Sequence, residues 1–227
     1  DWSSDVCSSD LKAHTRVKIC KKALAKKKES AIIKGIIEKS DFMLETKRLI
    51  LRPWQVEDAQ SCYKYAQNPN IGPKAGWPVH ESVENSREII RTVLSAPNTF
   101  AVVLKETMEP IGSIGLMIGK QSNLSIAENE GEIGYWIGEP YWGQGLIPEA
   151  TKELMRYGFV DCQLKKLWCG YFDGNDKSRR VQEKCGFHYL RSDIKEWPLI
   201  HQTLTEHVLF ITKEEWEQNK QEEATRK

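Results

Sequence analysis

Apolar side chains recur along the chain in two patterns, which together predict an alternation of short strands and helices from residue 43 onward. Strands are predicted where β-branched and apolar residues lie between turn-forming residues, at 44–52, 99–105, 111–118, 130–137, 166–172, 187–191 and 201–212. Helices are predicted where apolar residues share one face at helical spacing, at 56–67, 82–95, 146–160, 176–185 and 213–219. The loop at 70–80, which contains two glycines and two prolines, separates the first two helices.

The predicted order from residue 43 is therefore β-α-α-β-β-β-α-β-α-β-β. Three consecutive strands joined by short loops indicate a meander, and the later β-α-β unit indicates a parallel pair with a right-handed crossover. We expect an α/β fold in the α+β sense: a single domain with a mixed central sheet of about seven strands and helices on both faces.

Composition excludes several classes of protein. The 227 residues are 40% hydrophobic with a net charge of +1, as in an ordinary globular protein rather than a disordered one. No apolar run approaches the roughly 18–20 residues that a membrane span requires, so no membrane role is expected. The six cysteines form no C-x-x-C pair and the histidines have no ligand spacing, so a cytoplasmic protein without a metal is expected.

The near-zero net charge conceals a split between the leader and the rest of the chain. Residues 1–11 carry three Asp, residues 12–42 carry nine Lys and one Arg against three acids, and residues 43–227 are mildly acidic. Residues 1–11 resemble a translated sequencing adapter. We therefore expect 1–42 to be a leader made of this artefact and of translated upstream sequence, disordered or loosely helical, with Met43 as the start. A single domain is expected over 43–219 and a polar tail over 220–227. The alternative is a real basic arm, supported by the lysines at 21, 22 and 26–28, that binds nucleic acid or membrane. Residues 43–227 offer no basic stripe, so no nucleic-acid binding is expected through them.

The most informative segment is a predicted strand that runs through Gly143-Gln144-Gly145 into a helix. Glycines let the backbone approach a ligand closely, and the first amides of a helix have no partner within it, so a pyrophosphate would suit this loop. Pro148 stands where a dinucleotide-binding fingerprint would place its third glycine, and no Walker sequence is present. An ordinary tight turn is the alternative.

Three motifs in this order resemble the GNAT superfamily of N-acetyltransferases. The segment from Glu132-Ile-Gly-Tyr-Trp-Ile to Tyr141-Trp-Gly-Gln-Gly is similar to the acyl-CoA loop of the Rim-type branch, which acetylates N-terminal amines of ribosomal proteins. Residues 175–187 match the family's Asn, Ser, Lys and Gly-Phe spacing, and residues 46–53 match a motif near its start. The resemblance implies that residues 43–219 form an acetyltransferase domain, an acetyl-CoA-dependent acyltransferase that acts on a primary amine.

The resemblance also implies roles for single residues. Glu132 is expected to be the base, although an edge-strand or substrate-orienting carboxylate is an equal alternative, and the N–H of Ile137 is expected to bind the thioester carbonyl. The pyrophosphate is assigned to the backbone of Trp142, Gly143, Gln144, Gly145 and Leu146. Asn175 and Ser178 are expected to face the pantetheine arm. Many family members carry a tyrosine as thiolate acid where this chain has Gln182, so Ser178 is expected to be the acid.

The acceptor pocket is expected to form from two loops that carry Trp77, His80 and Trp197. The acceptor is a protein N-terminus or a small-molecule amine, and the enzyme is expected to be a monomer or a homodimer. A non-catalytic acyl-CoA-binding or ribosome-associated module on the same fold is the competing interpretation.

Overall fold

The computed structural model describes residues 42–225. The predictions for the leader, apart from Phe42, and for residues 226 and 227 lie outside this range. No helix within the described part is long and apolar enough to cross a membrane.

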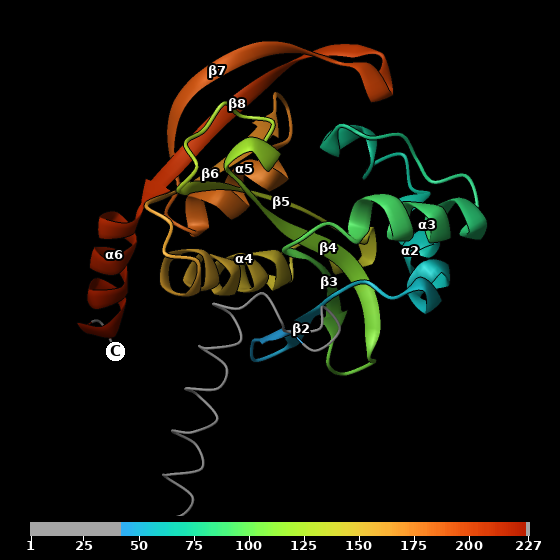
Figure 1. Cartoon of the computed structure of the whole chain (residues 1–227), viewed down its shortest axis with the longest axis horizontal. Helices are drawn as coiled ribbons and strands as arrows, with labels where there is room; N and C mark the ends of the chain where they lie inside the picture. Colours follow the sequence, from blue (N-terminus) through green and yellow to red (C-terminus); the bar gives the residue numbers. More distant parts are fainter. Residues whose placement is uncertain (1–41, 226–227) are drawn as a thin grey trace, which may run out of the picture. The chain divides into compact units, whose positions relative to one another are not determined.

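A single mixed sheet of eight strands forms the centre of the fold, in the order β1-β2-β3-β4-β5-β6-β8-β7 (Figure 1). The strands are β1 (Leu44–Glu45), β2 (Leu49–Arg52), β3 (Thr99–Leu104), β4 (Glu109–Ile118), β5 (Glu130–Ile137), β6 (Lys166–Phe172), β7 (His188–Trp197) and β8 (Gln202–Thr212). The pair β5–β6 is parallel and the other neighbouring pairs are antiparallel. The predicted mixed sheet is confirmed. The strand predicted at 44–52 is instead two short strands, because the chain turns between Glu45 and Leu49 and Leu44 pairs with Leu51.

Among the described residues, five α-helices pack around this sheet: α2 (Ala59–Ala66), α3 (Val83–Ile89), α4 (Leu146–Arg156), α5 (Asp176–Lys184) and α6 (Lys213–Thr225). Single π-helical turns over Ile90–Leu94 and Tyr157–Asp161 extend α3 and α4. Helix α6 continues beyond the predicted end at residue 219, so residues 220–225, expected to be a polar tail, are helical.

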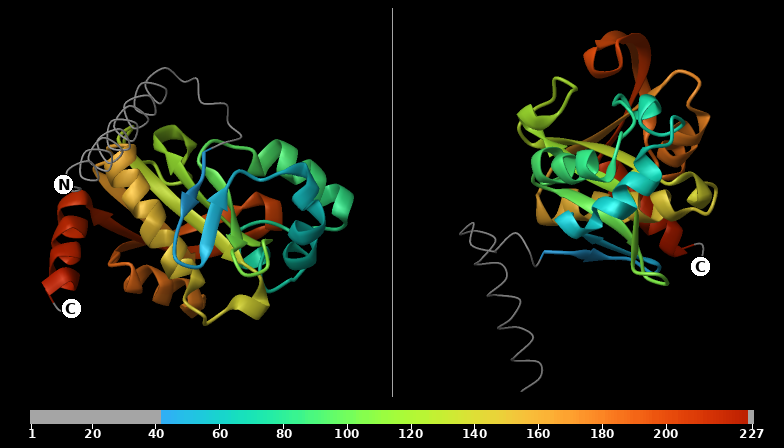
Figure 2. Two further views of the ribbon diagram at one scale, coloured as in Figure 1. Left: turned by 90° about the horizontal axis from the view of Figure 1, so that it is seen from below. Right: turned by 90° about the vertical axis from the view of Figure 1, so that its right-hand side faces the viewer.

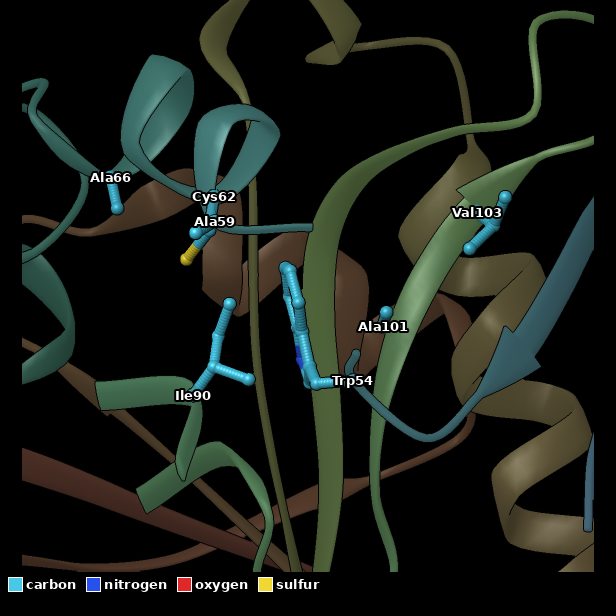
Figure 3. Close-up of a cluster of buried hydrophobic side chains, with 7 residues drawn as sticks. All are labelled: Trp54, Ala59, Cys62, Ala66, Ile90, Ala101 and Val103. Atoms are coloured by element: carbon cyan, nitrogen blue, oxygen red, sulfur yellow. The ribbon is translucent and has the colours of Figure 1, made fainter. Parts of the chain in front are cut away.

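The helices divide between the two faces of the sheet (Figure 2). Helices α2 and α3 cover one face through a buried cluster of Trp54, Ala59, Cys62, Ala66, Ile90, Ala101 and Val103 (Figure 3). Within this face the indole N–H of Trp54 donates to Ser113 Oγ of β4 at 3.1 Å. Leu116, three positions further along β4, points to the opposite face, where it packs near Gly158 in the π-helical turn that extends α4. Active-site side chains on β5 therefore face the α2–α3 side or the α4–α5 side according to their parity.

The last two strands form a long hairpin that reaches past the end of the sheet toward the loop between α2 and α3 (Figure 1). Strand β7 extends to Trp197, six residues beyond the predicted end at residue 191. Its outer half was missed because Asp193, Lys195 and Glu196 interrupt the apolar pattern. At the tip of the hairpin, a Cβ atom added to Gly76 would lie 2.6 Å from Cε3 of Trp197, so the two segments are in contact.

Candidate active site

The site is organised by the divergence of β5 from β6. Their parallel register pairs are Glu130 with Lys166, Gly131 with Leu167 and Glu132 with Trp168, and the pairing ends there. Strand β5 nevertheless continues to Ile137 and remains paired with β4. An opening between two central strands therefore begins at Glu132.

The carboxylate of Glu132 lies at the apex of this opening. Its Oε2 accepts hydrogen bonds from Ser122 Oγ at 2.6 Å and from the Asn123 amide at 3.0 Å. Its Oε1 accepts none from any residue between 42 and 225. Glu132 is buried between β4 and β6, so the edge-strand alternative is wrong.

Burial raises the pKa of Glu132, and the hydrogen bond from Ser122 opposes the rise only in part. The buried carboxylate of Glu206 on β8 adds to the rise. Glu206 itself is paired with Lys195 at 2.8 Å. A carboxylate with a raised pKa and one free oxygen is a stronger base than an ordinary carboxylate and can take up a proton.

The backbone N–H of Ile137 points into the same opening. Gly138, the next residue, donates its N–H to Ile111 O at 2.8 Å, and hydrogen-bonded pairs alternate along antiparallel strands. The N–H of Ile137 is therefore directed away from β4, toward the side from which β6 has diverged. A carbonyl oxygen in the opening can accept from it.

The glycine loop that follows β5 presents its amides outward. Gly143 and Gly145 have φ angles of +76° and +73°, and a Cβ on Gly143 would meet no atom within 4 Å. The N–H groups of Gly143, Gln144, Gly145 and Leu146 make no hydrogen bond to any residue in the described range. These amides stand at the N-terminus of α4, where the helix dipole favours an anion. A pyrophosphate fits this loop.

Trp142 contributes to the site through its side chain and not, as expected, through its backbone N–H. Its amide donates to Glu139 O at 3.1 Å and is therefore occupied, which corrects its assignment as a backbone ligand of the pyrophosphate. Its indole N–H donates to Ile137 O at 3.0 Å and fixes the loop to the end of β5. Lys177 Nζ lies 3.5 Å from the centre of the Trp142 ring. This contact joins the glycine loop to the first turn of α5.

The two predicted pantetheine residues lie at the start of α5. Asn175 is the N-cap, and its side chain accepts from the Ser178 amide at 3.2 Å. The Ser178 hydroxyl lies 3.0 Å from the hydroxyl of Tyr135, which reaches across from β5. Ser178 and Glu132 thus belong to opposite sides of the opening, because Tyr135 and Glu132 differ in parity on β5. A thioester held between them would have a base on one side and a hydroxyl on the other.

The three predicted acceptor residues lie on the α2–α3 side and at the hairpin tip. Trp77 packs edge-on against Trp136 of β5, with ring centres 5.8 Å apart, and Trp197 packs against Phe172 at 4.8 Å. His80 is buried behind Trp77, and its Nδ1 lies 2.8 Å from Ser86 Oγ. The two tryptophans can form walls of a pocket, whereas His80 supports one of them.

Arg48 and Tyr135 also belong to the site, although their motifs gave neither residue a role of its own. Arg48 belongs to the motif near residue 46, and its guanidinium donates to Gln144 O at 2.9 Å and to Glu149 at 2.7 Å. Tyr135 belongs to the β5 motif, and its odd parity relative to Glu132 was the signal that it faces the α4–α5 side. Within the described part of the chain, no group of three or more His, Cys, Asp or Glu side chains could hold a metal ion.

Comparisons with known proteins agree on one family. The acetyltransferase (GNAT) domain matches residues 48–188. The uncharacterized N-acetyltransferase p20 of Bacillus licheniformis is 33% identical over 129 residues, which cover 55% of this chain and 70% of p20. A GNAT-family acetyltransferase from Bacillus anthracis superposes with a TM-score of 0.66 and 22% identity, over 76% of this chain and 99% of that one. Mycobacterium smegmatis RimJ in complex with CoA-disulfide superposes with a TM-score of 0.62 and 19% identity, over 77% and 88% of the two chains.

Proposed function

The chain belongs to the GNAT family of acetyltransferases, which move an acetyl group from acetyl-CoA to an amine, and on this premise we propose roles for its residues and its acceptor. Glu132 is the base, the N–H of Ile137 binds the thioester carbonyl, and Ser178 is the acid. The amides from Gly143 to Leu146 bind the pyrophosphate, and Asn175 lies beside the pantetheine arm.

One observation carries these assignments. The opening between β5 and β6 starts at Glu132, and the same strand ends in a loop whose amides have no partner in the described chain. Glu132, the N–H of Ile137 and the glycine loop therefore follow one another along a single strand and its exit. That sequence of groups suits a thioester threaded between the strands with its phosphates at the start of α4.

The chemistry follows from the charges that must move. A primary ammonium with a pKa near 8, or near 10.4 for a lysine, must lose a proton before its nitrogen can attack. Glu132 Oε1 accepts this proton, directly or through water. The Ile137 N–H donates to the carbonyl oxygen as negative charge gathers there. Ser178 passes its hydroxyl proton to the departing sulfur, which leaves as a thiol. The second proton lost by the nitrogen returns to the Ser178 oxygen and restores its hydroxyl.

We propose a protein N-terminal amine as the acceptor, with a small-molecule amine as the alternative. The resemblance of the β5 motif to the Rim-type branch supports the first choice. Trp77 and Trp197 form the walls of the acceptor pocket, and His80 holds Trp77 from behind. Glu206 and Lys195 lie on the Glu132 side of the sheet, where the acceptor enters.

The test uses the whole chain. Calorimetric titration with acetyl-CoA is expected to give one site per chain, and thiol release is expected with peptides that begin in Ala or Ser. A polyamine provides the small-molecule arm of the same assay. A folded chain that binds no acetyl-CoA would contradict the proposal as a whole, whereas turnover of the polyamine alone would contradict only the choice of acceptor.

A further inference from the structure

The hydroxyl of Ser178 sits between two side chains that the family resemblance does not assign. Tyr135 OH lies 3.0 Å from Ser178 Oγ, and Gln182 Nε2 lies 3.2 Å from the same atom. The three residues come from two elements, since Tyr135 belongs to β5 and the other two lie one turn apart on α5. They meet at the edge of the opening between β5 and β6, on the α4–α5 side.

The orientation of the Gln182 amide is fixed by its other contact. Its Nε2 also donates to Gly170 O at 2.9 Å, and only the NH₂ group of an amide can face a carbonyl oxygen. Gln182 is buried, and its Oε1 has no partner in residues 42–225. Exchanging the nitrogen and oxygen of the amide would therefore gain no hydrogen bond and would place two oxygens against each other at Gly170. Gln182 is therefore a hydrogen-bond donor to Ser178, and Ser178 Oγ is an acceptor in that bond.

Burial raises the pKa of Tyr135 above its usual value near 10, so its hydroxyl keeps its hydrogen at neutral pH. Its single hydrogen has two acceptors within reach, Ser178 Oγ at 3.0 Å and the Ser178 backbone carbonyl at 3.2 Å. When it donates to Oγ, both lone pairs of that oxygen are used, one by Tyr135 and one by Gln182. The Ser178 hydrogen is then free to point away from both donors.

We propose that Tyr135 is a positioning residue that turns the Ser178 hydroxyl hydrogen toward the sulfur of CoA. This inference rests on the proposed role of Ser178 and deepens it. With no thiolate present, Ser178 donates to Tyr135, and Tyr135 donates to the Ser178 carbonyl. When negative charge appears on sulfur, Ser178 donates to it and Tyr135 turns its hydrogen to Ser178 Oγ. No proton leaves Tyr135, so the tyrosinate that burial disfavours never forms.

The chain in this way compensates for the residue at position 182. The resemblance implies a tyrosine acid at that position, whereas Gln182 cannot act as an acid and instead donates to Ser178. Tyr135 supplies the second donor from the strand opposite. The arrangement needs Tyr135 for its hydroxyl alone, since its ring packing survives in phenylalanine.

The test measures the thiol pKa of bound CoA, which needs no acceptor. The full chain saturated with CoA is titrated with pH, and thiolate formation is followed by its ultraviolet absorbance. A donor aimed at sulfur lowers the thiol pKa below that of free CoA, and Tyr135→Phe is expected to raise it again by about one unit. Ser178→Ala is expected to raise it at least as much, and the Tyr135→Phe, Ser178→Ala double variant no further than Ser178→Ala.

Tyr157→Phe is the matched control. Its hydroxyl also makes a hydrogen bond, to Asn98 at 3.0 Å, but it lies away from the site, so its removal should leave the thiol titration unchanged. An unchanged titration in Tyr135→Phe together with a shift in Ser178→Ala would overturn the role of Tyr135 and leave the proposed function intact. A folded wild-type chain that binds no CoA would overturn both.

Discussion

Arg48 and Glu149, 101 positions apart in the sequence, form an ion pair with 2.7 Å between Nε and Oε2. Glu149 also accepts from the Arg48 amide and from the Thr46 hydroxyl, while the Arg48 guanidinium donates to Gln144 O inside the glycine loop. The motif near residue 46 therefore braces the loop and the first turn of α4. The network also lowers the pKa of Glu149 by hydrogen bonds from Thr46 and Arg48 that outweigh its burial.

Loss of this brace should loosen the loop without removing any of its amides. Arg48→Ala is expected to weaken acetyl-CoA binding about tenfold, because a charge-assisted hydrogen bond contributes on the order of 1.5–3 kcal/mol. Calorimetry measures the change, and Arg191→Ala, which removes an ion pair with Asp193 on β7, is the control. Equal affinity in Arg48→Ala and wild type would show that the loop holds its shape alone.

Backbone conformation is the requirement at Gly143. Gly143→Val should abolish acetyl-CoA binding, since a β-branched residue at φ +76° is strained and its side chain would occupy the cradle. Gly174→Val is matched in strain, because Gly174 has a φ of +78° and equally open surroundings but lies in the turn between β6 and α5. Both variants should lose stability in thermal unfolding, and only the first should lose affinity. If both bind alike, the cradle lies elsewhere.

The acid limb of the pH–rate profile should report Glu132. Because burial raises its pKa, the fraction able to accept a proton falls as pH decreases at values above those usual for a carboxylate near 4.3. Glu132→Gln should lower turnover by about 100-fold or more and remove this limb, with acetyl-CoA affinity retained. Glu130→Gln, two residues earlier on the same face, should keep both the rate and the limb. A Glu132→Gln profile that matches wild type would exclude Glu132 as the base.

The contact between Gly76 and Trp197 should affect binding of the acceptor and should not affect binding of acetyl-CoA. Gly76→Ala places a methyl group where the Trp197 ring lies and strains a residue at φ +85°, so the hairpin tip must move. We expect KM for the acceptor to rise about tenfold or more, with acetyl-CoA affinity unchanged. Leu199→Ala, at an exposed position of the same tip, tests whether any change there suffices. A rise in KM of the same size in both variants would argue against a specific contact.

His80 should make stability depend on pH. Burial lowers its pKa to about 4, while an unfolded histidine titrates near 6.5, so the unfolded chain binds the proton more strongly between these values. The contribution of neutral His80 to the free energy of unfolding is therefore fully present above pH 6.5 and is lost as pH falls toward 4. About 2 kcal/mol of this free energy is lost between pH 7 and pH 5. Urea unfolding at both pH values should show a smaller loss in His80→Asn. The control His201→Asn changes an exposed histidine in a turn and should behave as wild type.

Much of the fold was predictable because strands and helices follow from local periodicity. The meander of β3, β4 and β5 and the parallel pair β5–β6 were predicted correctly, since short loops and a helical crossover each permit few arrangements. The extent of β7 was not, because one face of its outer half is exposed and the half-buried face carries the charged residues Asp193 and Lys195, so no apolar alternation reveals it. The turn at residues 46–48 was missed because each of the two strands it separates is too short to have a period of its own.

The sequence by itself determined where the proposed phosphate cradle, a glycine loop that enters a helix, is placed, because the glycines and the helix are adjacent in the chain and act through the backbone. It also determined that Glu132 and Tyr135 face opposite sides of their strand. Only the tertiary structure decided which residues each side chain contacts. Tyr135 contacts Ser178, 43 positions away in the sequence, and Arg48 contacts Glu149, 101 positions away. The physical reason is that register and helix placement set these distances, and both depend on the packing of the whole sheet rather than on any one segment.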